Sequence, residues 1–381
     1  MVVQSYADAS YKRLTMKVVF RTDASIQIGT GHVMRCLTLA DALAAKGAQS
    51  IFVCREHKGN LIEQIRSKGH RVYVLPIGNG ADTDLAHSAW LGATQVQDIE
   101  ACVPLLAKLQ PDCLVVDHYA LDALWEVEAG KVCTNLMVID DLADRNHACN
   151  LLLDQTFGRS AKDYQALVPD YCTLLCGSKY ALLRPEFAAL RPYSLQRRLQ
   201  PQLKQLLITM GGVDKDNVTA QVLNALSGCQ LQADFGITVV MGAAAPWLAD
   251  VQRQAETMPW PTTVLVDVNN MAQLMADSDL AIGAAGATSW ERCCLGLPSI
   301  LVVLAANQAM IAEALSNAGA VLQVETSELQ SRLAQMLVIL GDHEALSLVS
   351  HSASQICNGQ GTGHIVRQMM KGHNENHTAM Q

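Results

Sequence analysis

Short apolar runs alternate along the chain with stretches in which apolar residues recur every three or four positions. The short runs predict buried strands, and the longer stretches predict amphipathic helices. In the first half, strands are expected at residues 17–22, 49–54, 71–75, 113–117, 135–140, 151–154 and 173–177. Helices are expected at residues 33–46, 61–68, 82–109 (with a possible break) and 121–129. This alternation predicts a parallel sheet with helices on both faces and ligands at the carboxyl ends of its strands.

A second block with the same alternation begins at Gln205. Its strands are expected at residues 205–209, 235–241, 263–267, 280–283, 299–303 and 320–323. Its helices are expected at residues 217–226, 246–256, 270–277, 287–295, 307–317 and 327–337. The pattern therefore predicts two α/β domains whose strand ends face one another across a cleft, a common place for ligands.

The segments between and beyond these blocks set the expected boundaries. Residues 191–204 contain two prolines and show no clear periodicity, so they are interpreted as a linker between domains at 16–190 and 205–370. Residues 1–15 and 371–381 are polar and are expected to be a disordered leader and tail. A helical stretch near 362–371 can pack on either domain.

Composition and charge narrow the possible partners. The chain has 381 residues, 50% of them hydrophobic, which is enough for two cores. A net charge of -8 argues against a nucleic-acid partner. No apolar run reaches the roughly 18 residues of a membrane span, and the leader lacks the apolar middle of a secretory signal. The 12 scattered cysteines are interpreted as small buried apolar residues in a reducing cytoplasm, not as a disulfide or zinc framework.

The chain's most informative stretch is Gly29-Thr30-Gly31-His32-Val33-Met34-Arg35, between the first predicted strand and the first predicted helix. Its glycines permit a sharp turn and close approach to a ligand, and the helix start directs free N–H groups into the same space. His32 is therefore expected beside an anionic substrate, as the residue that transfers a proton. The alternative is that His32 satisfies a neighbouring backbone carbonyl.

Glycines also follow two strands of the second block. Gly286, with Thr288 and Ser289 after it, permits close approach of a diphosphate, and Glu291 can accept hydrogen bonds from a ribose. Alternatively, Gly286 permits tight packing and Glu291 complements the helix dipole. The pair Gly211-Gly212 is either a turn or a second part of the ligand site.

Polar residues end two further strands of the first block. Asp117, His118 and Tyr119 can orient His32 through hydrogen bonds, or Asp117 can cap the next helix while Tyr119 packs against it. The loop Asp140-Asp141-Leu142-Ala143-Asp144-Arg145 suits a cation or an ion-paired loop, and we favour the latter. His57, His87 and His147 show no ligand spacing and are expected at the surface.

Several of these motifs together resemble a known family. Residues 21–24 and 28–35, with 116–119, 139–145, 182–187 and 209–212, are similar to the UDP-2,4-diacetamido-2,4,6-trideoxy-β-L-altropyranose hydrolases of pseudaminic acid biosynthesis, in the order of that family. The resemblance covers residues 16–323. The second block also resembles the UDP-GlcNAc transferase of peptidoglycan synthesis, at 271–279, 286–291, 296–298 and 307–308.

These resemblances imply the GT-B architecture of two Rossmann-like domains. They imply a UDP-sugar substrate and a reaction without a metal or other cofactor. Membrane insertion is not expected, because no apolar run is long enough, and no obligate protein partner is predicted. They imply His32 as the catalytic base, with Tyr119 beside it. The implied binding residues are Gly29, Gly31, Arg35, Gly211, Gly212, Asn307 and Gln308 for the substrate, and Gly286, Thr288, Ser289 and Glu291 for UDP.

Three alternative functions remain open at this point. A glycosyltransferase on the same fold would use a sugar or lipid acceptor instead of water, because fold alone does not decide function. A non-catalytic UDP-sugar sensor would bind without turnover. A nicotinamide dehydrogenase is disfavoured, because the glycine pattern lacks the dinucleotide fingerprint and its ribose-binding acid.

Overall fold

The computed structural model of the protein describes the backbone of residues 15–379, and the side chains over that range except at 306–307 and 373–379. The expected leader therefore lies outside the described residues apart from Thr15, and so do the last two residues of the expected tail.

The N-terminal lobe is built on a seven-stranded sheet in the order β3-β2-β1-β4-β5-β6-β7, with every neighbouring pair parallel. Its strands are β1 Lys17–Thr22, β2 Gln49–Arg55, β3 Arg71–Leu75, β4 Cys113–Asp117, β5 Leu136–Ile139, β6 Leu151–Asp154 and β7 Thr173–Cys176. Its helices are α1 Gly31–Ala44, α2 Ile62–Ser67, α3 Gln95–Leu109 and α4 Ala123–Gly130, with 3-10 turns η1 Ser88–Leu91, η2 Ala161–Asp163 and η3 Ser178–Tyr180. Alternate residues of β1 belong to different cores: Phe20 packs with α1 on one face of the sheet, and Val19 packs with α3 and α4 on the other. Both sets of side chains are buried because helices cover both faces of the sheet.

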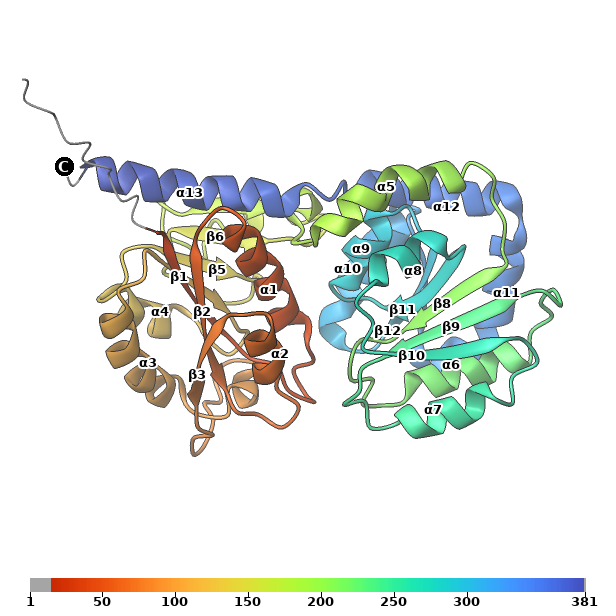
Figure 1. The fold of residues 1–381 in the computed structure, drawn as a ribbon, viewed down its shortest axis with the longest axis horizontal. Helices are drawn as coiled ribbons and strands as arrows, with labels where there is room; N and C mark the ends of the chain where they lie inside the picture. Colours follow the sequence, from red (N-terminus) through yellow and green to blue (C-terminus); the bar gives the residue numbers. More distant parts are fainter. Residues whose placement is uncertain (1–14, 380–381) are drawn as a thin grey trace, which may run out of the picture.

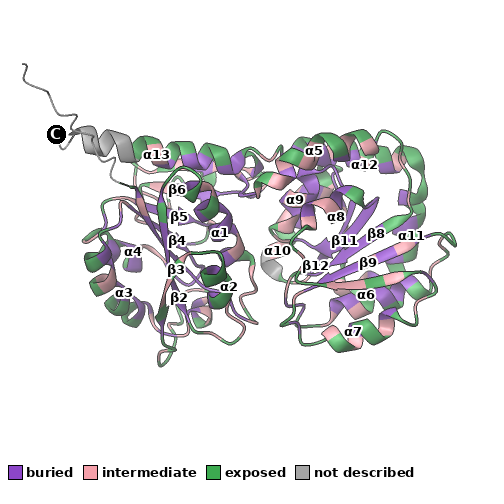
Figure 2. Cartoon of the chain, viewed as in Figure 1, coloured by how far each residue is buried: buried purple, intermediate pink, exposed green. Residues whose placement is uncertain are grey.

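The C-terminal lobe is built on a six-stranded parallel sheet in the order β10-β9-β8-β11-β12-β13. Its strands are β8 Gln205–Thr209, β9 Gly236–Met241, β10 Thr262–Val266, β11 Leu280–Ala284, β12 Ser299–Val303 and β13 Leu322–Glu325. Its helices are α6 Val218–Ser227, α7 Leu248–Ala255, α8 Met271–Asp277, α9 Thr288–Cys294, α10 Ala306–Asn317, α11 Leu329–Gly341 and α12 His343–Ile356, with the 3-10 turn η4 Thr326–Glu328. Figure 2 shows the result in both lobes: the strands are mostly buried, and the exposed residues lie on the outer faces of the helices.

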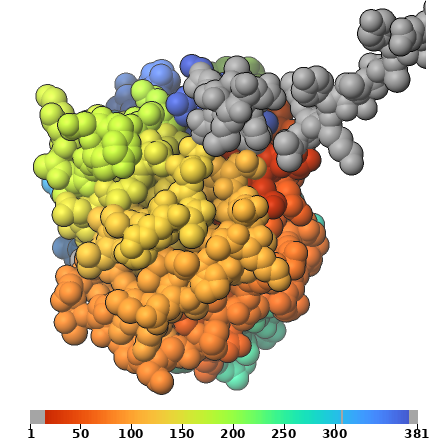
Figure 3. Space-filling model, turned by 90° about the vertical axis from the view of Figure 1, so that its left-hand side faces the viewer, coloured from red at the N-terminus to blue at the C-terminus, as the bar shows by residue number. Residues whose placement is uncertain are grey.

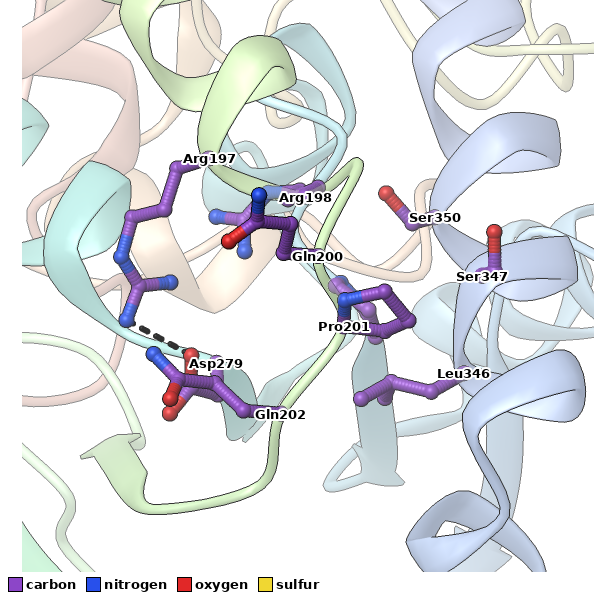
Figure 4. A pocket seen from close by; sticks show the side chains of 10 residues that line it. Arg197, Arg198, Gln200, Pro201, Gln202, Asp279, Leu346, Ser347 and Ser350 are labelled. Atoms are coloured by element: carbon purple, nitrogen blue, oxygen red, sulfur yellow. Dashed lines mark ion pairs between the residues drawn. The ribbon is translucent and has the colours of Figure 1, made fainter.

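The segment between the sheets begins as helix α5, Pro185–Arg197, although no clear periodicity marks it in the sequence. The first seven residues of the expected linker therefore belong to a helix, which packs on α8 and α9 of the C-terminal lobe. Arg198 just beyond it donates to the carbonyls of Ser278 at 2.9 Å and Met275 at 3.1 Å. Arg197 forms an ion pair with Asp279 at 2.6 Å (Figure 4). Arginine contacts to carbonyls leave no apolar repeat, which is why hydrophobic spacing misses this helix.

The last helix, α13 Gly361–Ala379, returns to the N-terminal lobe (Figure 1). Ile365, Val366 and Met369 are buried in the core that α1 forms with its sheet. The expected C-terminal domain of 205–370 is therefore too long, because its last residues pack on the other lobe. The expected disordered tail is also wrong as far as Ala379, where the helix ends. Figure 3 shows the end face of the molecule, made largely by N-terminal-lobe residues, with blue C-terminal residues at its upper edge.

The predicted strands agree with the structure to within about two residues, β13 being shifted furthest. The helix expected at 82–109 is broken into η1 and α3, and α12 was not predicted. Among the described residues, no single helix is long and apolar enough to cross a membrane, although residues 326–341 and 343–372 meet that test when taken together as a bent pair.

The order of the strands fixes where a ligand can bind. In each sheet the chain leaves the two central strands in opposite directions, β1 and β4 in the first lobe and β8 and β11 in the second. Loops at such a switch point diverge and leave a crevice at the carboxyl ends of the strands. The register Thr22↔Asp117 brings the glycine loop after β1 beside the end of β4, and Gly283↔Thr209 does the same in the second lobe.

Candidate active site

A cleft of about 360 Å³ lies between the lobes, where these switch-point loops meet. Its lining residues come from the loop after β1, the ends of β4, β5 and β6, the loop after β8, and the turns before α9 and α10. The two glycine loops approach one another closely, since a Cβ added at Gly212 would lie 3.4 Å from the side chain of Thr30. The cleft expected from the sequence is thus present, and both lobes contribute to it.

The imidazole of His32 lies at this cleft, on the first turn of α1. Its Nδ1 lies 2.6 Å from Oδ1 of Asp117, at the end of β4. An ionised carboxylate can only accept hydrogen bonds, so Nδ1 carries a proton, and in the neutral imidazole Nε2 is the nitrogen with the lone pair. The arrangement supplies a base at the cleft whose tautomer is fixed by a buried carboxylate.

Arg35 lies one helical turn after His32, and the spacing of three residues places both side chains on the same face of α1. Its guanidinium donates from Nε to Oδ2 of Asp117 at 2.7 Å and from Nη2 to Oδ1 at 2.7 Å. It also donates to Asp141, in the loop after β5. Asp117 therefore anchors His32 and Arg35 together, behind the cleft surface.

The ring of Tyr119 meets the ring of His32 edge-on, with centroids 4.5 Å apart. Its hydroxyl donates to Oδ2 of Asp141 at 2.8 Å. Burial and the nearby Asp141 charge hold the pKa of Tyr119 well above its usual range, so the phenol stays protonated. Tyr119 is thus suited to position His32 rather than to act as a second base.

The charges in this cluster are set by burial and by one permanent cation. Burial alone would raise the pKa of Asp117, but the Arg35 guanidinium and His32 outweigh it and hold that pKa well below the usual range. Asp117 is therefore ionised at every pH at which the protein is expected to work.

The C-terminal lobe brings five of the predicted binding residues to the cleft: Gly211, Gly212, Gly286, Thr288 and Gln308. Gly211 has a φ of 91°, a conformation that favours glycine. An added Cβ at Gly286 would meet nothing within 4 Å, so the backbone there is open to a ligand. With His32, Tyr119, Gly29, Gly31 and Arg35 opposite, ten predicted site residues share one cavity.

Other predicted residues have different surroundings. The hydroxyl of Ser289 is buried and accepts from Arg292 at 3.1 Å, so the structure does not bring it to the cleft. Glu291 does not line the cleft and lies 3.8 Å from Arg184. The side chain of Asn307 lies outside the described residues.

The loop after β8 differs from the glycine loop after β1 in one respect. Asp214 accepts hydrogen bonds from the N–H groups of Val218 and Thr219, both at 2.9 Å. The start of α6 is therefore already occupied by a carboxylate, and it does not offer these N–H groups to an anion.

The remaining polar motifs of the first lobe are structural. The imidazole of His118 contacts other groups: its Nε2 lies 3.4 Å from Asp23, and its Nδ1 accepts from the N–H of Ala120 at 3.1 Å. Arg145 forms ion pairs with Asp140 at 2.8 Å and Asp144 at 3.0 Å, as in the ion-paired loop that we favoured.

The expected surface position of three histidines is wrong in different ways. His147 is fully buried and bonds Glu126 at 2.8 Å. His57 is mostly buried and lies 3.7 Å from Asp23. His87 is half-buried, with its ring against that of Trp90. The partners of His57 and His147 lie far from them in the sequence. The sequence around these histidines therefore shows no pattern from which their burial could be predicted.

Sequence reasoning missed several lining residues, among them Trp90, Gln155, Thr156, Lys215 and Asp141. Asp141 could have been assigned from the strand order, since β5 lies next to β4 in the sheet. The sequence gives no local signal for Trp90, because its turn η1 lies inside residues 82–109, where a helix with a possible break is expected.

The fold and the cleft place the protein in the class of GT-B proteins, which pair two Rossmann-like lobes. The chain superposes on MurG of Acinetobacter baumannii with a TM-score of 0.68 over 93% of this chain and 99% of that one, at 17% identity. Residues 205–357 match the glycosyltransferase family 28 C-terminal domain.

Relatives in sequence are more specific. The chain is 28% identical over 274 residues to the UDP-2,4-diacetamido-2,4,6-trideoxy-beta-L-altropyranose hydrolase of Campylobacter jejuni, covering 71% of this chain and 85% of that protein. It is 26% identical over 291 residues to an uncharacterized protein of Methanocaldococcus jannaschii, covering 75% of this chain but only 55% of that relative, so it spans about half that relative's length. The resemblance to the hydrolase, inferred from the motifs, is confirmed.

Proposed function

We propose that the protein hydrolyses UDP-2,4-diacetamido-2,4,6-trideoxy-β-L-altropyranose to UDP and the free sugar, with inversion at the anomeric carbon, in pseudaminic acid biosynthesis. The observation that carries this proposal is the pair of His32 and Asp117 at the interlobe cleft, 2.6 Å apart. The similarity to the Campylobacter hydrolase supports the choice of substrate.

In the proposed reaction, Nε2 of His32 takes a proton from a water molecule as its oxygen attacks the anomeric carbon. The bond between that carbon and the diphosphate oxygen breaks, and its electron pair leaves with UDP. The attacking water approaches from the face opposite UDP, so the configuration inverts. The proton that His32 receives is balanced by the Asp117 carboxylate, which holds the imidazolium in place.

The binding roles divide between the lobes. UDP docks on the C-terminal lobe, with its diphosphate against Gly286 and Thr288 and its ribose near Glu291. The sugar extends toward His32 and Arg35, past Gln308 and the Gly29 loop. Apart from Glu291, the residues assigned here to UDP and to the sugar line the cleft. Asn307 remains a predicted sugar-site residue. No metal step is proposed, and the helix starts at the cleft are assigned to stabilise the charge that builds on the leaving diphosphate.

We place this reaction in the cytoplasm. All twelve cysteines are free thiols, including the pair Cys149 and Cys172 with sulfur atoms 3.6 Å apart. Free thiols this close persist in reducing compartments.

A glycosyltransferase remains the second candidate, because residues 205–357 match a glycosyltransferase domain. Proton NMR of the protein with the UDP-sugar and no acceptor separates the two. We expect UDP and free sugar in equal amounts, with the inverted anomer first. No release until an acceptor is added would favour the transferase, and tight binding with no turnover would favour a sensor.

A further inference from the structure

Three aromatic rings form a continuous wall on the N-terminal-lobe side of the cleft. Trp90 lies near-parallel to Tyr119, with ring centroids 5.9 Å apart and an angle of 27° between the planes. His87 contacts both, at 4.3 Å from Trp90 and 5.5 Å from Tyr119. Trp90 and Tyr119 both line the cleft, and the proposed reaction assigns no role to Trp90.

The fold holds Trp90 in place. Its turn η1 lies in the long connection between β3 and α3, whose ends are joined by the hydrogen bond from Gly78 N to Gly92 O at 2.8 Å. Leu91 beside it is 1% exposed and belongs to the core under α3 and α4. Burial of its neighbour keeps the half-buried indole at the cleft instead of free in solvent.

The position of the wall follows from the chemistry at His32. A water molecule in hydrogen-bond reach of Nε2 attacks a carbon roughly 3–3.5 Å further on. The hexose must therefore lie next to the imidazole, whose neighbour is the ring of Tyr119 at 4.5 Å. Trp90 is the next ring along the wall, so it faces the far side of a hexose whose anomeric carbon is at His32.

We propose that Trp90 is a specificity-determining residue, whose ring packs against the methyl-bearing edge of a 6-deoxy-acetamido sugar and whose indole N–H donates to an acetamido carbonyl. This inference rests on the proposed function. In the part of the chain that the structure describes, no residue accepts a hydrogen bond from the indole N–H of Trp90, so that donor is available to a ligand.

Both halves of the contact match one substrate class. A 6-deoxy sugar presents a methyl group where common hexoses carry a hydroxyl, and burying that methyl against an aromatic ring is favourable. A hydroxyl in the same place would lose water without gaining a partner from the ring face. The acetamido group supplies the acceptor that the indole N–H requires.

Equilibrium binding separates the sugar contact from the nucleotide contact. Calorimetry is performed on the full chain carrying His32→Asn, so that the ligand is not consumed, with UDP and with the UDP-linked diacetamido-trideoxyhexose as probes. Adding Trp90→Ala is expected to weaken binding of the UDP-sugar by about tenfold or more, since one methyl in an apolar site is worth roughly 10–200-fold. UDP affinity is expected to stay within about twofold, which also shows that the variant is folded.

Trp90→Phe keeps a ring and removes only the N–H donor, so its loss of UDP-sugar affinity should lie between those of the parent and the alanine variant. Equal losses for UDP and UDP-sugar, or no loss for either, would overturn the inference while leaving the proposed hydrolysis intact. If the His32→Asn protein binds neither probe, the proposed function fails, and the inference fails with it.

Discussion

At the residue scale, the site depends on one buried carboxylate that accepts hydrogen bonds from two side chains. Asp117 accepts from His32 and from two nitrogens of Arg35, so replacing either partner alters the electrostatics of the other. Asp117 is fully buried, and such groups hold their partners in a single geometry because the alternative is an unpaired charge.

His32→Asn tests the assignment of the base. An asparagine keeps a polar side chain at the start of α1 but cannot take a proton from water. We expect kcat to fall about 10²–10⁴-fold, the usual contribution of a general base. Calorimetry with UDP should give an unchanged affinity, because UDP is placed on the other lobe. Near-normal turnover in this variant would remove His32 from the mechanism.

At the element scale, His147 ties the chain before β6 to α4 and to the loop after β5. Burial would lower its pKa, but the carboxylates of Asp140, 3.9 Å from Nε2, and Glu126, 2.8 Å from Nδ1, outweigh burial and raise the pKa to about 9. A folded pKa above the unfolded value of about 6.5 stabilises the protein fully below pH 6.5, and this stabilisation is lost as the pH rises through 9.

His147→Gln should therefore be less stable than the parent at pH 6, by a margin that shrinks by about 3 kcal/mol toward pH 9.5. Urea unfolding at the two pH values measures this margin. His351→Gln, on the exposed side of α12, is the matched control and should track the parent at both. A margin that is the same at both pH values would contradict the ion-paired state of His147.

Helix α13 gives a second prediction at this scale. Ile365→Ala should lower the free energy of unfolding by about 2–5 kcal/mol, as expected for a buried large-to-small change. Hydrogen exchange should show the loss of protection in α1 and η3 of the N-terminal lobe, which α13 contacts. Leu348→Ala, 65% exposed on α12, should change little. Loss of protection confined to β8–β13 would contradict the docking of α13.

The elements also show what hydrophobic periodicity can predict. Buried strands such as Cys113–Asp117 are continuous apolar runs, so their positions were correct from the sequence. Helix α5 is held by arginine contacts to carbonyls, and α13 packs on α1, near the opposite end of the chain. Neither kind of interaction leaves a local repeat, so the linker and the tail were misassigned.

At the scale of the whole molecule, the site exists only where the two lobes meet. The glycine loops after β1 and β8 could be predicted from the sequence, because in each case a predicted strand is followed by glycines and then by a predicted helix. Their meeting at Thr30 and Gly212, and the aromatic wall at Trp90, depend on strand order and on a long connection that the sequence does not specify locally.

The central claim is that water, activated at His32, attacks the sugar carbon and not the phosphorus. Hydrolysis of the UDP-sugar in ¹⁸O-labelled water, followed by mass spectrometry of the UDP released, tests it most directly. Cleavage of the carbon–oxygen bond predicts UDP without label, because its terminal phosphate keeps the original bridging oxygen. UDP carrying one ¹⁸O on that phosphate would mean attack at phosphorus and would contradict the account.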